Sequence, residues 1–171
     1  MNNRNHLNII GIETSCDDTA IGIVRSDKRI LSNVVINQNS NLSKYGGIIP
    51  EVAARDHLYN IDFAIEDALE KAKLKIENID LVTATGGPGL IGGVIVGTVF
   101  AKSLAMSLEK PYVAVNHLEG HALTARLSEN VSYPYLLLLV SGGHTQIIAV
   151  LEYGNYKRIS STLDDAAGGN I

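Results

Sequence analysis

Hydrophobic and polar residues alternate in three short segments near the start of the chain. The segments are residues 7–13, 20–24 and 29–36, and all three are rich in isoleucine or valine. Alternation with a period of two predicts β-strands, and the short polar connections between the segments fit hairpin turns. The pattern therefore predicts a three-stranded meander at the start of the domain.

A helical pattern begins at Pro50, because proline is tolerated in the first turn of a helix. Apolar residues then recur every three or four positions as far as Leu69. Beyond this helix, predicted strands alternate with predicted helices in the order strand 79–85, helix 90–107, strand 112–115 and helix 117–127. Such alternation favours an α/β lobe with a mixed, largely parallel sheet and flanking helices.

A polar stretch at 128–134 separates this region from a second group of apolar segments. The group echoes the first meander, with predicted strands at 135–140, 145–151 and 156–163. We therefore expect two domains, residues 1–131 and residues 132–171, the second being the first strands of an incomplete lobe. No predicted helix follows these strands, so one face of their sheet is expected to be uncovered around Leu136 to Val140.

Composition narrows the classes of function. The chain has 171 residues, 46% of them hydrophobic and 19% charged, which is typical of a folded globular protein. Its net charge of −4 argues against a protein that binds nucleic acid without help from a partner. The single cysteine, Cys16, cannot form an internal disulfide, and no apolar run reaches the roughly 20 residues that span a bilayer. We expect a cytoplasmic protein with no membrane segment.

Two histidines in the segment His117-Leu-Glu-Gly-His121 are the clearest candidates for chemistry. Four residues are about one turn of a helix, so both imidazoles project from one face and are able to share a divalent metal. The alternative is a helix cap or a buried, hydrogen-bonded histidine. A metalloprotease is weakly indicated, because the glutamate does not directly follow the first histidine as it does in zincins.

Two strand–turn–strand elements carry small polar residues at their bends. The first is Gly11-Ile-Glu-Thr-Ser-Cys-Asp-Asp18, and the second is Val140-Ser-Gly-Gly-His-Thr145. Backbone N–H groups in such turns are able to bind a phosphate, although both elements also fit ordinary hairpins. The glycines of Thr85-Gly-Gly-Pro-Gly89 lack the spacing of a dinucleotide or phosphate loop, so they indicate a tight turn and close helix packing.

Six motifs in one order carry a resemblance to a known family. They closely resemble the TsaD/Gcp family of tRNA N6-adenosine threonylcarbamoyltransferases, formerly called O-sialoglycoprotein endopeptidases. The resemblance runs from about residue 7 to residue 168, and its motifs are Gly11-Ile-Glu-Thr-Ser-Cys-Asp-Asp-Thr19, Pro50-Glu-Val-Ala-Ala-Arg-Asp-His57, Gly87-Pro-Gly89, His117-Leu-Glu-Gly-His121, Ser141-Gly-Gly-His-Thr145 and Asp164-Asp-Ala-Ala-Gly168.

The resemblance implies an actin-like fold of the ASKHA (ribonuclease H-like) class. It also implies transfer of a threonylcarbamoyl group from threonylcarbamoyl-AMP to N6 of adenosine 37 in tRNAs that read ANN codons. By position, His117 and His121 would bind iron, or zinc as the alternative, and Asp17 would lie near the phosphate and the metal as a catalytic residue. The adenylate would be bound by Val140, Ser141, Gly142, Gly143 and His144.

The resemblance also implies partners. They are tRNA, subunits of the TsaB and TsaE type, and a separate chain that supplies the rest of the second lobe. The family continues after Asp-Asp-Ala-Ala-Gly with Glu-Ala-Phe-Asp-Lys, whereas this sequence reads Gly169-Asn170-Ile171, so we expect a truncated, N-terminal half. Two other functions stay open: a non-catalytic dimerisation subunit of the same complex and a metalloendopeptidase.

Overall fold

The computed structural model describes residues 6–37, 48–140 and 145–163, and these form two compact units. The first unit is Met1–His117 and the second is Leu118–Ile171. Helix α4 from residue 118 onward therefore belongs to the second unit. The change of domain between residues 131 and 132, which the sequence suggested, stays a prediction.

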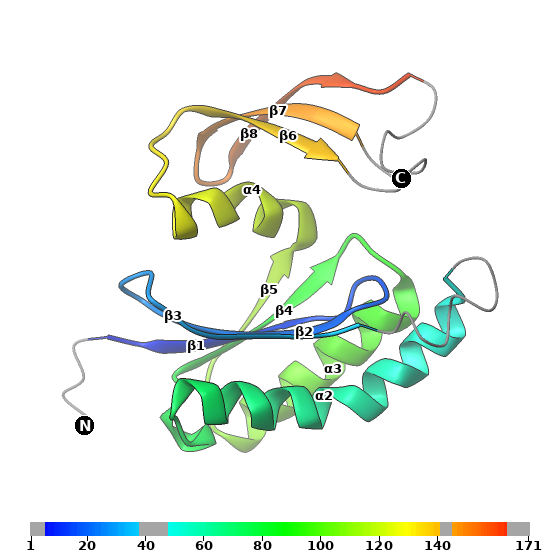
Figure 1. Cartoon of the computed structure of the whole chain (residues 1–171), viewed down its shortest axis with the longest axis vertical. Helices are drawn as coiled ribbons and strands as arrows, with labels where there is room; N and C mark the ends of the chain where they lie inside the picture. The colour runs from blue at the N-terminus through cyan, green and yellow to red at the C-terminus, as the bar shows by residue number, and fades with distance from the viewer. Residues whose placement is uncertain (1–5, 38–47, 141–144, 164–171) are drawn as a thin grey trace. The chain divides into compact units, whose positions relative to one another are not determined.

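The first unit is built on a five-stranded sheet with strand order β3-β2-β1-β4-β5 (Figure 1). Strands β1, β2 and β3 form the predicted antiparallel meander, and β4 and β5 extend it in parallel from β1. The strand bounds are β1 Asn8–Glu13, β2 Thr19–Arg25, β3 Ile30–Ile36, β4 Leu81–Gly87 and β5 Tyr112–Asn116.

The prediction of a mixed sheet is confirmed. Strands β1, β2 and β3 pair antiparallel, and the part of the chain in which strands alternate with helices adds β4 and β5 in parallel to β1. The connections between the first three strands are too short for the crossover that parallel pairing requires. The meander therefore contributes the two antiparallel pairings of this five-stranded sheet.

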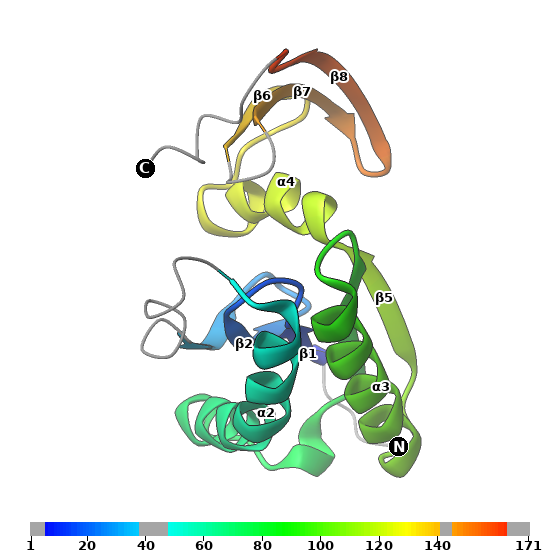
Figure 2. The same ribbon diagram turned by 90° about the vertical axis from the view of Figure 1, so that its right-hand side faces the viewer.

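Helices α2 (Pro50–Ala72) and α3 (Ile91–Ser107) cover one face of this sheet (Figures 1 and 2). A short 3₁₀ helix, η2 (Ile76–Asn78), which the sequence did not predict, joins α2 to β4. Every second residue of β1 and β2 is buried toward the helices, as the alternating pattern requires. The core is made mainly of isoleucine, valine and alanine, and includes Ile10, Ile12, Ile21, Ile23, Ile61, Ala64, Val82 and Ala101.

The second unit combines α4 (His117–Ser128), from residue 118 onward, with the three-stranded antiparallel sheet β6-β7-β8. Its strands are β6 Tyr135–Val140, β7 Thr145–Glu152 and β8 Asn155–Ser161, so the predicted second meander is confirmed. Two tyrosine hydroxyls of the sheet donate hydrogen bonds to α4: Tyr135 to the carbonyl of Ala122 and Tyr156 to Glu119 Oε1. The helix that precedes the strands is thus hydrogen-bonded to their sheet.

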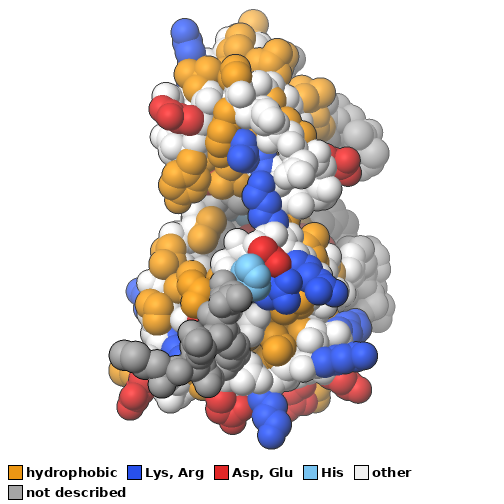
Figure 3. All heavy atoms as spheres, turned by 90° about the vertical axis from the view of Figure 1, so that its left-hand side faces the viewer, with side chains coloured by type: hydrophobic (Ala, Val, Ile, Leu, Met, Phe, Trp, Pro, Cys, Tyr) orange, Lys and Arg blue, Asp and Glu red, His pale blue; other side chains and the backbone are white. Residues whose placement is uncertain are grey.

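The other face of this small sheet is uncovered, as the sequence predicted. Leu136 and Leu138 are 68% and 65% exposed. Leu139, which lies between Leu138 and Val140 in the strand, is only 7% exposed. The strand register places Leu138 opposite Ile147, which is also exposed, so the apolar side chains share one face. We call Leu136, Leu138, Val140 and Ile147 the open face; hydrophobic side chains reach the surface of both units in the view of Figure 3.

Among the described residues, no helix is both long enough and apolar enough to cross a membrane.

Candidate functional site

The turn between β1 and β2 is fixed to α3 by direct contacts. Thr14 Oγ1 donates a 2.8 Å hydrogen bond to the Gly93 carbonyl, and the Leu90 N–H donates a 2.7 Å bond to the Ser15 carbonyl. Thr14 and Ser15 are almost fully buried. The start of this polar turn is therefore a packed part of the first unit.

Glycines on and before α3 make this approach possible. A Cβ atom at Gly93 would lie 2.1 Å from the Thr14 carbonyl oxygen, one at Gly97 would lie 2.2 Å from Thr14 Oγ1, and one at Gly89 would lie 2.5 Å from the Ser15 carbonyl oxygen. Real Cβ atoms do not come so close to other atoms, so a side chain at these positions would force the turn away. The interpretation of these glycines as close packing is confirmed.

A buried histidine on α2, His57, holds the next part of the turn. Its Nε2 lies 3.1 Å from the Cys16 carbonyl oxygen, and its Nδ1 lies 2.8 Å from Thr19 Oγ1. Because a carbonyl accepts only, Nε2 carries the hydrogen and the Thr19 hydroxyl donates to Nδ1. His57 belongs to one of the six motifs, yet its sequence position alone did not reveal this role.

The tip of the turn carries Cys16, Asp17 and Asp18. Partial burial and the hydrogen bond with the neighbouring Asp17 carboxylate raise the pKa of the Cys16 thiol to about 11. Burial, and then the negative charge of Asp17, raise the pKa of Asp18. Cys16 is therefore a protonated thiol at neutral pH, which agrees with the acidic setting in the sequence. Nothing in these contacts tests the catalytic role of Asp17.

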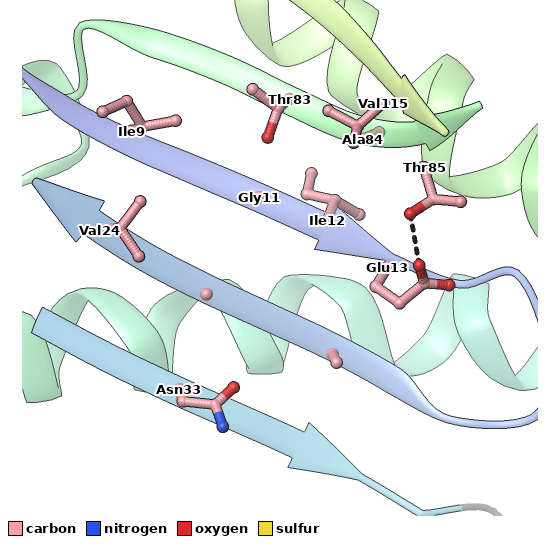
Figure 4. A pocket seen from close by; sticks show the side chains of 12 residues that line it. Ile9, Gly11, Ile12, Glu13, Val24, Asn33, Thr83, Ala84, Thr85 and Val115 are labelled. Atoms are coloured by element: carbon pink, nitrogen blue, oxygen red, sulfur yellow. Dashed lines mark hydrogen bonds between the residues drawn. The ribbon is translucent and has the colours of Figure 1, made fainter. Parts of the chain in front are cut away.

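Glu13, at the end of β1, connects this turn to the start of α4. Glu13 Oε1 accepts a 2.6 Å hydrogen bond from the Ser15 N–H, and Oε2 accepts one from the Thr85 hydroxyl at the end of β4 (Figure 4). Glu13 Oε2 also lies 3.1 Å from His117 Nδ1, and Ser15 Oγ lies 3.1 Å from the same nitrogen. Burial raises the pKa of Glu13, but these hydrogen bonds outweigh it and lower the pKa overall.

A shallow hollow of about 300 Å³ extends from Glu13 along the sheet face away from the helices (Figure 4). Small and apolar side chains form most of its lining, with Asn33, Thr83 and Thr85 as polar members and Glu13 as its ionisable one. It is a feature of the sheet surface, and no ionisable side chain besides Glu13 is among the described residues that line it.

The candidate metal ligands begin the last helix of this region. His117 is the first residue of α4, and His121 follows it in the same helix, so the helical placement of the pair is confirmed. No group of three or more histidine, cysteine, aspartate or glutamate residues able to hold a metal occurs within residues 6–37, 48–140 and 145–163. A metal at this pair would therefore need further ligands from outside the described part of the chain.

Most of the predicted adenylate-binding residues lie outside the part of the chain that the structure describes. Val140 ends β6, where it pairs with Thr145 of β7 and belongs to the open face. Ser141, Gly142, Gly143 and His144 lie outside the described residues. The first polar turn is described in full. Its Ser15 N–H donates a hydrogen bond to Glu13, so this N–H is already used within the protein and is not available to a phosphate.

The family model for TsaD, tRNA N6-adenosine threonylcarbamoyltransferase, matches residues 29–171. This chain belongs to the TsaD family. A relative from Rickettsia prowazekii, named tRNA N6-adenosine threonylcarbamoyltransferase, is 58% identical over 160 residues, covering 94% of this chain and 41% of the relative. A relative of the same name from Rickettsia rickettsii (strain Sheila Smith) is 56% identical over 162 residues, covering 95% of this chain and 47% of the relative. The chain thus spans less than half the length of these TsaD proteins.

Solved structures show the same fold at low identity. YeaZ from Pseudomonas aeruginosa superimposes with a TM-score of 0.59 at 18% identity, covering 91% of this chain and 66% of that one. A second structure, described as an uncharacterized protein with similarity to peptidase YeaZ, gives a TM-score of 0.60 at 15% identity, covering 91% and 64%. The actin-like α/β fold expected for a TsaD protein is therefore confirmed.

Proposed function

We propose that this chain forms the N-terminal half of a tRNA N6-adenosine threonylcarbamoyltransferase. The reaction transfers a threonylcarbamoyl group from threonylcarbamoyl-AMP to N6 of adenosine 37 in tRNAs that read ANN codons. The observation that carries the proposal is the pairing of His117 with Glu13 in a chain 58% identical to a named enzyme of this activity. The substrates are tRNA and the adenylate, and the compartment is the cytoplasm.

The chemistry is an acyl transfer with a good leaving group. N6 of adenosine attacks the carbamoyl carbon, a C–N bond forms, the bond from that carbon to the phosphate oxygen breaks, and AMP leaves as N6 loses a proton. No covalent enzyme nucleophile is required, so the protonated Cys16 thiol has no place in the reaction. A bound divalent metal would supply charge stabilisation at the carbonyl oxygen.

His117 and His121 are the residues we propose to hold that metal, iron first and zinc as the alternative. The donor set fits this purpose, because imidazole nitrogen suits both metals. The carboxylate beside His117 Nδ1 is the arrangement that metal-binding histidines usually have. Asp17, at the half-buried tip of the turn that Thr14 and His57 fix, is proposed to lie near the phosphate.

The open face of β6 and β7 supports a second part of the proposal. Leu136, Leu138, Val140 and Ile147 are each more than a third exposed, and such an apolar surface is normally covered. We propose that the remainder of a full-length TsaD protein, on this chain or a separate one, covers this face. Val140 to His144 would then bind the adenylate with walls from both parts. Subunits of the TsaB and TsaE type are the proposed further partners.

The test uses the chain joined to the remaining half of the Rickettsia prowazekii relative. His117→Ala and His121→Ala should each lower the metal content, measured by mass spectrometry, and reduce formation of threonylcarbamoyladenosine at least about 100-fold. His6→Ala is the matched control, because His6 is an exposed histidine whose nearest ion-pair partner is Asp27 at 3.9 Å. It should change neither quantity.

The same assay separates the alternatives. Metal content unchanged in both variants would refute the metal site. Absence of the modified nucleoside from the joined wild-type protein, with the TsaB- and TsaE-type subunits present, would favour a non-catalytic subunit. Cleavage of casein that depends on His117 would favour the metalloendopeptidase.

A further inference from the structure

Glu13 is an ionisable residue of the site to which the sequence assigned no role. We propose that Glu13 is a positioning residue for His117: it accepts the hydrogen of Nδ1 and so directs Nε2 to the metal. The inference rests on the metal site of the proposed function and adds the residue that sets its geometry.

The carboxylate is itself held in place by two other elements. The Ser15 N–H donates a 2.6 Å hydrogen bond to Glu13 Oε1, and the Thr85 hydroxyl donates one to Glu13 Oε2. Glu13 ends β1 and Thr85 lies near the end of the neighbouring parallel strand β4, so their side chains meet at the same end of the sheet (Figure 4). Glu13 is therefore a fixed acceptor and not a side chain that samples many rotamers.

The contact with His117 sets which nitrogen carries the proton. Glu13 Oε2 and His117 Nδ1 are 3.1 Å apart, and an ionised carboxylate has only acceptors. Nδ1 must therefore donate, which in a neutral imidazole places the lone pair on Nε2. Ser15 Oγ lies 3.1 Å from the same nitrogen and further restricts the ring.

His117 lies at the end of a helix, so its contact with Glu13 affects how firmly the imidazole is held. His117 is the first residue of α4, where a helix end frays unless it is held. The carboxylate fixes the orientation of the ring against the ends of β1 and β4. A ligand so fixed binds a metal without losing rotamer freedom, and loss of such an outer carboxylate typically weakens metal binding about 10- to 100-fold.

The experiment reads the tautomer and the metal affinity separately in the 171-residue chain. Long-range ¹H–¹⁵N NMR at about pH 8, where an ordinary imidazole is neutral, reports which His117 nitrogen bears hydrogen. Zinc titration against a coloured chelator reports affinity. The variant is Glu13→Gln, which keeps the size and removes the charge, and Glu66→Gln on the exposed side of α2 is the matched control.

We expect wild-type His117 to carry its hydrogen on Nδ1. In Glu13→Gln that preference should be lost and zinc should bind about 10- to 100-fold more weakly, while Glu66→Gln changes neither reading. Zinc affinity unchanged in a folded Glu13→Gln variant would overturn the proposal, and so would hydrogen on Nε2 in the wild type.

Two further variants, Thr85→Val and His117→Ala, cover the cases in which Glu13→Gln does not fold or the metal site itself is wrong. If Glu13→Gln does not fold, Thr85→Val loosens the same carboxylate from β4 and should give a smaller loss of affinity in the same direction; no loss would overturn the proposal. If zinc affinity is unaffected by His117→Ala while the wild-type tautomer is as expected, the metal site of the proposed function has failed, and the role of Glu13 toward it fails for that reason.

Discussion

The two units of this chain bury the faces of their β-sheets to different extents. In the first unit, α2 and α3 cover a sheet face whose isoleucines and valines are almost fully buried. In the second, α4 binds the small sheet, yet Leu136 and Leu138 on the open face remain about two-thirds exposed. Burying a leucine is worth about 1.5–3 kcal/mol, so the open face leaves a considerable part of the possible stabilisation unused.

This difference bears on our proposal that further protein covers the second unit. The contacts of Glu13 and Ser15 with His117 lie within the first unit, which builds its own core, whereas His121 belongs to the second unit. The predicted adenylate-binding segment begins at Val140, at the end of a strand on the open face. The first unit should therefore tolerate surface changes and fail on changes to its packing, whereas the second should gain solubility from surface changes.

The largest expected effect is in the packing of the first unit. Gly93→Ala places a Cβ 2.1 Å from the Thr14 carbonyl oxygen, and relief of this clash requires the backbone to move. We expect a loss of about 3 kcal/mol in the free energy of unfolding, measured by urea denaturation. Gly22→Ala is the control, because nothing lies within 4 Å of its added Cβ, and it should be neutral or slightly stabilising. Equal stability of the two variants would contradict the close contact of α3 with the turn.

The second effect separates the two faces of β6. Leu139→Ala should destabilise the second unit by about 2–3 kcal/mol, because this leucine is buried. Leu138→Ala should change stability by less than about 0.5 kcal/mol, because Leu138 itself faces outward and is 65% exposed. Leu138→Ala should also reduce self-association in sedimentation velocity, and Leu139→Ala should not. The reverse pattern would mean that the register of β6 is shifted by one residue.

The smallest expected effect concerns Cys16. A pKa raised to about 11 leaves little thiolate at neutral pH, and the fraction of thiolate grows as the pH rises toward that value. Alkylation by iodoacetamide should therefore be slow at about pH 7 and speed up steadily to about pH 11. Cys16→Ser should keep activity within a few-fold in the protein joined to its remaining half. A plateau of alkylation below about pH 9 would contradict the raised pKa, and a loss of activity greater than about tenfold would give the thiol a functional role.

Much of the fold could be predicted because its strands follow simple local patterns. The predicted segments 7–13, 20–24 and 29–36 match β1, β2 and β3 to within one residue at each end, and the helix beginning at Pro50 is observed. The glycines before and within α3 were assigned correctly to close packing. The order of the strands in the sheet could not be predicted, because it depends on which strands become neighbours, and local alternation does not report that.

The candidate site was only partly predictable, for a related reason. The histidine pair was visible because its spacing is local, within one helix. Glu13 and His117 are 104 residues apart, and only the parallel order β1-β4-β5 brings the strand ends and the start of α4 together. His57 was hidden for the same reason, since its partners Cys16 and Thr19 lie in another element. Long-range side-chain contacts such as these require the fold.

The measurement that tests the account most directly is threonylcarbamoyladenosine formation on an ANN-reading tRNA. The purified 171-residue chain is compared, with threonylcarbamoyl-AMP and the TsaB- and TsaE-type subunits, in the absence and presence of the remaining half of the Rickettsia prowazekii relative. We predict no modified nucleoside from the chain without that half, and formation on its addition that is abolished by His117→Ala. Robust multiple turnover by the chain without that half would contradict the account, because it would show that the open face needs no cover and that the site is sufficient as it stands.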